Sequence, residues 1–103
     1  MKKTLIVAGL LGLMASVPVM ADAPKPAKLM VCAGCHTATG KAILPNYPNI
    51  GGQNPEYFTL AVNAYKNGER TGTNANLMKA FANMLSDDEI KEFAAYFATQ
   101  NNK

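Results

Sequence analysis

Both cysteines of the chain and its only histidine lie within five consecutive residues, Cys32-Ala33-Gly34-Cys35-His36. This C-x-x-C-H spacing is typical of the covalent attachment of a c-type haem. Each thiol would form a thioether with one haem vinyl group, and the adjacent imidazole would bind the iron from the same side. The motif therefore predicts one haem c, iron protoporphyrin IX bound through two thioethers. Cys32 and Cys35 are the predicted attachment residues, and His36 is a predicted axial iron ligand.

Two other uses of the motif agree less well with the rest of the sequence. A thioredoxin-like dithiol needs a preceding strand and βαβ surroundings, and the sequence contains no credible strand pattern. A structural zinc site needs four ligands, and the chain has no second cluster of cysteine or histidine. Haem attachment is therefore the preferred interpretation.

Residues 1–21 have the pattern of a cleaved secretory signal peptide. Lys2 and Lys3 form a charged start, residues 4–17 are almost entirely apolar or small, and the segment ends at Ala21, a small residue suited to cleavage. A retained membrane anchor is the alternative, because the apolar stretch is near the shorter limit for a membrane span. Cleavage is favoured, and it predicts a periplasmic protein that is not inserted in the membrane. Haem c is also attached outside the cytoplasm, so the two signals agree.

The predicted mature chain, residues 22–103, is a single small domain. At this size an apolar core alone gives little stability, and a covalently held haem would supply an apolar centre. Without Lys2 and Lys3 the chain has eight basic and seven acidic residues, a net charge of +1. No basic run with interleaved aromatic residues occurs, so nucleic-acid binding is not expected. A monomer is expected.

The predicted fold class is all-α, with three to four short helices around the covalently attached haem. Glycine and proline make residues 37–52 a loop, and residues 69–76 are polar and loop-like. The first expected helix covers about 27–35. The second runs from the N-cap Asn54 to Asn67-Gly68, and its apolar face carries Tyr57, Leu60, Ala61, Ala64 and Tyr65. A short helical turn is expected over 77–84, and the last helix begins at the capping box Ser86-Asp87-Asp88-Glu89 and has an apolar stripe of Ile90, Phe93, Ala94 and Phe97.

A second axial ligand would decide what the iron can do. A methionine thioether raises the potential and suits a carrier of single electrons, and Met30, Met78 and Met84 lie in the predicted mature chain. Met30 shares a helix with the haem cysteines and cannot reach the opposite face. Met84 directly precedes the last helix and is expected to pack beneath it. Position therefore favours Met78 and leaves Met84 as the alternative.

Several further segments follow a known pattern: Tyr47-Pro48-Asn49-Ile50-Gly51-Gly52-Gln53, Lys66-Asn67-Gly68-Glu69-Arg70, Leu85-Ser86-Asp87-Asp88-Glu89-Ile90 and Ala94-Ala95-Tyr96-Phe97. With these and the C-x-x-C-H motif, the mature chain resembles the class I cytochromes c, of the small soluble bacterial kind also found as single domains of dihaem cytochromes. The resemblance implies that Met78, seven residues before Leu85, is the second axial ligand. It also implies that the carbonyl of Pro48 accepts a hydrogen bond from the proximal imidazole. The chain departs from the family pattern at Ala27, where glycine is common, and at Val31, where an aromatic residue is common.

The predicted function is that of a periplasmic one-electron carrier with His/Met axial ligation, which is not an enzyme and meets its redox partners, a donor and an acceptor, transiently. The alternative is a haem c electron-transfer subunit of a periplasmic dehydrogenase complex of the flavocytochrome or sulfite/sulfide-oxidising type. A haem protein with an open gas-binding site is less favoured, because such bundles carry C-x-x-C-H near the C-terminus. Candidates for auxiliary roles are Lys28, Lys41 and Lys79 toward an acidic partner, Arg70 and Gln53 toward the haem propionates, and Tyr47, Asn74, Asn76 and Asn83 as hydrogen-bonding groups near a propionate or the methionine sulfur.

Overall fold

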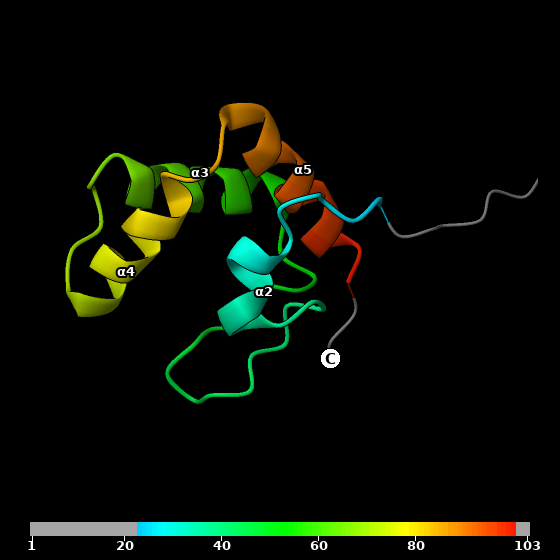
Figure 1. The fold of residues 1–103 in the computed structure, drawn as a ribbon, viewed down its shortest axis with the longest axis horizontal. Coiled ribbons are helices and arrows are strands. Elements are labelled where there is room, and N and C mark those ends of the chain that lie inside the picture. Colours follow the sequence, from blue (N-terminus) through cyan, green and yellow to red (C-terminus); the bar gives the residue numbers. More distant parts are fainter. Residues whose placement is uncertain (1–22, 101–103) are drawn as a thin grey trace, which may run out of the picture.

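The computed structural model describes residues 23–100, and the predicted signal peptide lies outside these residues. Within them the chain forms four helices and no strand (Figure 1). The helices are α2 (Met30–His36), α3 (Pro55–Lys66), α4 (Thr73–Ala82) and α5 (Asp87–Ala98). The predicted all-α class is therefore confirmed. No helix between residues 23 and 100 is long and apolar enough to cross a membrane.

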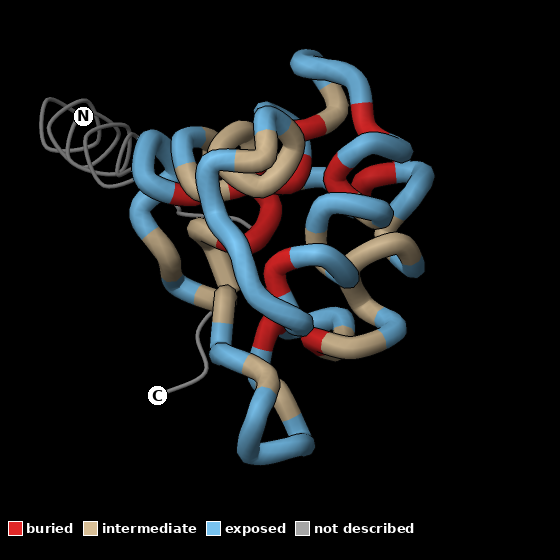
Figure 2. Tube along the Cα trace, turned by 90° about the vertical axis from the view of Figure 1, so that its left-hand side faces the viewer, coloured by how far each residue is buried: buried red, intermediate tan, exposed pale blue. Residues whose placement is uncertain are grey.

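Helix α5 forms the centre of the apolar core, as its sequence pattern predicts. Ile90, Phe93 and Phe97 are fully buried, and the Phe97 ring packs on those of Phe58, Phe93 and Tyr96 at centroid distances of 5.8, 6.1 and 5.1 Å. Burying side chains of this size contributes about 1.5–3 kcal/mol each. In Figure 2 the buried positions gather toward the middle of the molecule, whereas the connecting loops are mostly exposed.

The predicted capping box starts α5. The Ser86 hydroxyl accepts a hydrogen bond from the Glu89 amide, and the Glu89 carboxylate accepts one from the Ser86 amide. The Ser86 amide, followed by the Lys28 ammonium, lowers the pKa of Glu89. A lowered carboxyl pKa in the folded state stabilises the protein above the unfolded-state pKa, and this contribution is lost as the pH falls through the folded-state pKa.

Helix α3 begins as predicted but buries a different face. The Asn54 side chain accepts from the Tyr57 amide, and Pro55 occupies the first turn. The buried side chains are Phe58 and Val62, while Leu60 is 70% exposed. The prediction that Leu60 belongs to the apolar face is therefore wrong, because α5 packs against the neighbouring face that carries Phe58.

Helices α2 and α4 differ from their predicted bounds. Residues 27–29 form a turn, and α2 runs from Met30 to His36. Helix α4 starts at Thr73, inside the segment predicted as a polar loop, and ends at Ala82. It is stabilised by packing against α3 (Figure 1), with Ala75 and Ala82 buried. Tertiary packing of small residues here outweighs the weak local helix signal of the asparagines.

The long connection from α2 to α3 folds back on itself at Gly40. This residue is buried with φ +78°, and its carbonyl accepts hydrogen bonds from the amides of Ile50 and Gly51 at 2.7 and 3.2 Å. A Cβ at position 40 would lie 2.3 Å from the Gly51 nitrogen. The close approach of two backbone segments therefore requires glycine at this position.

Replacing Gly40 with alanine is expected to destabilise the protein by about 2–5 kcal/mol, because the left-handed conformation and the backbone clash add together. Gly68→Ala is the matched control: Gly68 has φ +76°, but the nearest atom to its added Cβ is the end of the Lys79 side chain at 3.4 Å. It should cost about 1–2 kcal/mol. Chemical denaturation of both variants measures the difference, and equal losses would contradict the clash.

Candidate functional site

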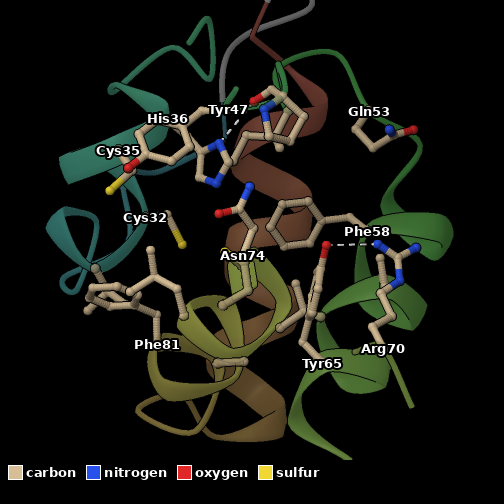
Figure 3. Close-up of a pocket in the computed structure, with 18 of the residues that line it drawn as sticks. Cys32, Cys35, His36, Tyr47, Gln53, Phe58, Tyr65, Arg70, Asn74 and Phe81 are labelled. Carbon is tan, nitrogen blue, oxygen red and sulfur yellow. Dashed lines mark hydrogen bonds between the residues drawn. The ribbon is translucent and has the colours of Figure 1, made fainter. Parts of the chain in front are cut away.

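A cavity of about 400 Å³ lies between α2, α3 and α4. The α2–α3 loop and the core residue Leu85 also line it. Both cysteines, His36, Pro48 and Met78 line it. Figure 3 shows Cys32, Cys35 and His36 on one side of the cavity, and Tyr65 and Arg70 on the other. Its apolar wall includes Val31, Ile50, Phe58, Ala61, Val62, Leu77, Phe81, Ala82 and Leu85. A cavity of this size can hold a small-molecule cofactor.

The two thiols are free and partly buried. Burial raises the pKa of the Cys32 thiol to about 12, because the thiolate would lose its solvation in apolar surroundings. One helical turn presents both thiols and the following imidazole to the cavity. The arrangement matches the chemistry that the C-x-x-C-H motif predicts.

The His36 ring is held by a backbone carbonyl. The side chain is 6% exposed, and Nδ1 lies 2.9 Å from the oxygen of Pro48 (Figure 3). Because a carbonyl oxygen can only accept a hydrogen bond, Nδ1 carries the hydrogen and is the donor. In the neutral imidazole, Nε2 then keeps its lone pair. Such a bond fixes the orientation of a metal-binding imidazole and raises its basicity.

The three methionines have different surroundings. Met78, from α4, is half-buried and lines the cavity. Met30 is 74% and Met84 is 55% exposed, and neither lines the cavity. The expectation that Met84 packs beneath the last helix is therefore wrong: the turn after α4 directs its side chain outward, and Leu85, 4% exposed, occupies the core instead.

Arg70 marks a polar end of the cavity. Its guanidinium donates to the hydroxyls of Tyr65 at 3.0 Å and Tyr57 at 3.1 Å, and its Cζ lies 4.8 Å from the centre of the Tyr65 ring. The hydrogen bonds to Tyr57 and Tyr65 raise the pKa of Arg70. Among the described lining residues, Arg70 is the only Lys, Arg, Asp or Glu. Of the other polar candidates, Gln53, Tyr47 and Asn74 line the cavity, whereas Asn76 and Asn83 do not.

Sequence reasoning missed two groups around the cavity. Phe58 and Val62 form part of its wall, and their four-residue spacing, one position after Tyr57 and Ala61, was a usable signal. The Tyr96 hydroxyl donates to the carbonyl of Ala38 at 2.7 Å and ties α5 to the loop after the haem motif. No local pattern predicts this contact, because the two residues lie 58 positions apart.

The lining residues fit haem c. Two thiols and an imidazole with a free lone pair converge on one side, a thioether lines the same cavity, and the remaining wall is mostly apolar. Soft sulfur and imidazole donors are suitable haem attachment groups and iron ligands. Arg70, among the described lining residues the one with a permanent positive charge, could neutralise a carboxylate of a bound cofactor.

Comparison with known proteins agrees with this fit. The cytochrome c family model matches residues 23–101. Cytochrome c-554(548) of Halomonas halodenitrificans is 41% identical over 73 residues, which cover 71% of this chain and 88% of that protein. The cytochrome subunit of sulfide dehydrogenase of Chlorobaculum tepidum is 38% identical over 72 residues, covering 70% and 62% of the two chains.

The fold agrees as well. A crystal structure of reduced recombinant cytochrome c4 from Pseudomonas stutzeri superimposes with a TM-score of 0.62 at 29% identity, covering 68% of this chain and 38% of that chain. The chain thus spans little more than a third of the cytochromes c4 that it matches. With the family-model match over the whole of residues 23–100, these findings show that the chain belongs to the cytochrome c family, binds one haem c covalently and serves in electron transfer.

Proposed function

We propose that the mature protein is a periplasmic carrier of single electrons whose iron is bound axially by His36 and Met78. The observation that carries the proposal is that His36, Met78 and both thiols line one cavity. When bound, haem c supplies an iron that changes between the ferric and ferrous states by one electron. With both axial positions occupied by protein side chains, no position would be open for a substrate. The protein is therefore proposed to transfer electrons without catalysing a reaction.

The chain's own residues have separate tasks in this proposal. Pro48 holds His36 in the tautomer whose Nε2 can bind a metal. The apolar wall would keep water from a bound haem, so that solvent rearranges little on electron transfer. Arg70, supported by Tyr57 and Tyr65, would neutralise the propionate carboxylates. The exposed Gly34, between the two thiols, would let a partner approach the attached edge of the haem closely.

The proposed periplasmic location rests on the charged start and apolar stretch of residues 1–21. Fractionation of cells that express the full chain should recover all haem-stained protein in the periplasmic fraction. Its N-terminus should be Asp22. Haem-stained protein that keeps residues 1–21 and stays with the membrane would contradict cleavage.

Replacing His36 with alanine is expected to prevent the formation of a normal low-spin holoprotein. No other imidazole exists in the chain, so nothing equivalent can take its place at the iron. The yield of covalent haem and the visible spectrum measure the effect, which should be a loss of most of the holoprotein. An unchanged low-spin spectrum in His36→Ala would exclude this role for His36.

A second candidate is a haem subunit of a dehydrogenase complex. It is favoured by the 38% identity to the cytochrome subunit of sulfide dehydrogenase, and by the exposed apolar side chains Met30, Ile43 and Leu60. Such a subunit should elute with a flavoprotein or molybdoprotein partner from a native periplasmic extract at moderate salt. A free carrier should elute alone, as small and weak interfaces release quickly.

A further inference from the structure

The turn between α4 and α5, residues 83–86, is held by two lysine side chains from other parts of the chain. The Lys66 ammonium, at the end of α3, donates to the carbonyl of Leu85 at 2.6 Å. The Lys28 ammonium, in the turn before α2, donates to the carbonyl of Met84 at 3.2 Å. Both carbonyls lie outside the helices. In Figure 1 this turn is the segment that runs from yellow α4 to orange α5.

The Lys66 contact differs from an ordinary surface lysine contact in its short distance and its burial. Hydrogen bonds from a charged donor are shorter and stronger than those between neutral groups, and the Lys66 contact is partly buried. Its acceptor belongs to Leu85, a core residue that also lines the cavity. Lys28 is further fixed by an ion pair of 3.0 Å with Glu89, the residue that completes the α5 capping box. Lys28 thus has two partners within the chain, Met84 and Glu89.

The turn directly follows the helix that carries Met78. Helix α4 packs against α3, but the N-cap residue at its other end, Gly72, has no side chain to cap it. Lys66 therefore connects the end of α3 to the turn that follows α4 and precedes α5. A change in this connection would let α4 move relative to the wall of the cavity formed by α3.

We propose that Lys66, assisted by Lys28, is a positioning residue that holds α4 against α3 and so keeps the thioether of Met78 at the iron. This inference rests on the proposed assignment of Met78. Lys66 does not touch the cofactor in this role. It acts through the Leu85 carbonyl and the helix that precedes it.

The test compares Lys66→Met, which removes the ammonium and keeps an unbranched stem, with the parent holoprotein. The weak near-infrared sulfur-to-iron band of the oxidised form and the far-ultraviolet circular dichroism are followed against guanidinium, and carbon monoxide binding is measured in the reduced form. In the parent, band and helix signal should disappear together. In Lys66→Met the band should disappear at lower denaturant, and carbon monoxide binding should increase by about 10- to 100-fold. Lys28→Met should change both in the same direction by less.

Two controls separate positioning from general stability. Lys66→Arg retains a charged donor and should behave like the parent, as should Lys91→Met, an exposed lysine of α5. If Lys66→Met yields no folded holoprotein, Lys28→Met decides the result. The proposal is overturned if band and helix signal still disappear together and carbon monoxide binding is unchanged. If Met78→Ala keeps the band, the assignment of Met78 as a ligand is wrong, and this inference is wrong with it. If Met78→Ala loses the band while the lysine variants match the parent, only the positioning role of the lysines is wrong.

Discussion

Replacing Cys32 and Cys35 together with alanine is expected to give a protein that loses all its haem in acidified organic solvent. The thioethers are the only covalent connection that this chain offers, since it has no other cysteine. The parent should keep its haem through the same extraction. Cys32 also packs against the apolar core, so the double variant should fold poorly as well.

The extraction has a simple control in Met84→Ala, a change outside the cavity that should leave the haem fully retained. Haem that stays with the Cys32→Ala, Cys35→Ala protein after extraction would exclude the thioether assignment. Weaker folding alone would not, because loss of the apolar centre and loss of attachment are separate effects.

The second large effect is expected for Met78→Ala. Removing the thioether should abolish the near-infrared band of the oxidised protein and lower the reduction potential by on the order of 100 mV, because the neutral sulfur ligand favours ferrous iron. The reduced variant should bind carbon monoxide, which the parent should resist. Absorption spectra and a potentiometric titration measure all three changes.

Met84→Ala is the matched control for this substitution. Its side chain is 55% exposed, so the change should cost less than about 1 kcal/mol and leave the band intact. Loss of the band in Met84→Ala but not in Met78→Ala would place the ligand six residues later in the chain. Retention in both variants would rule out methionine ligation from this part of the chain.

The elements that the sequence predicted well are those whose signals are local. The Ser86 capping box and the three- and four-residue spacings of Ile90, Phe93 and Phe97 fix α5 with no information from elsewhere. Asn54 and Pro55 likewise fix the start of α3. In each case the residues that decide the structure are neighbours along the chain.

The differences arise where distant contacts decide the structure. Helix α4 starts at Thr73 because its small residues pack on α3, which the polar sequence around Asn74 does not reveal. The position of Met84 depends on the turn that Lys28 and Lys66 hold from other elements. Similarly, Leu60 lies on the outer side of α3 because the aromatic core of α5 selects the face with Phe58.

The candidate site shows the same difference between local sequence signals and contacts between distant residues. The C-x-x-C-H motif by itself predicted the attachment residues and the proximal imidazole, because covalent chemistry fixes their spacing, and the fold places all three side chains at one cavity. The partners of Arg70 became visible only in the folded chain. There the hydroxyl oxygens of Tyr57 and Tyr65, both on α3, accept hydrogen bonds from the guanidinium, which also lies over the Tyr65 ring.

The central proposal, an iron with both axial positions occupied by His36 and Met78, is tested most directly by a carbon monoxide challenge of the parent holoprotein. The reduced-minus-oxidised spectrum of protein purified from the periplasm is recorded before and after addition of carbon monoxide at neutral pH. The proposal predicts a low-spin haem c spectrum that carbon monoxide leaves unchanged. A rapid shift of the reduced spectrum would show an open iron position and contradict the assignment of a His/Met electron carrier.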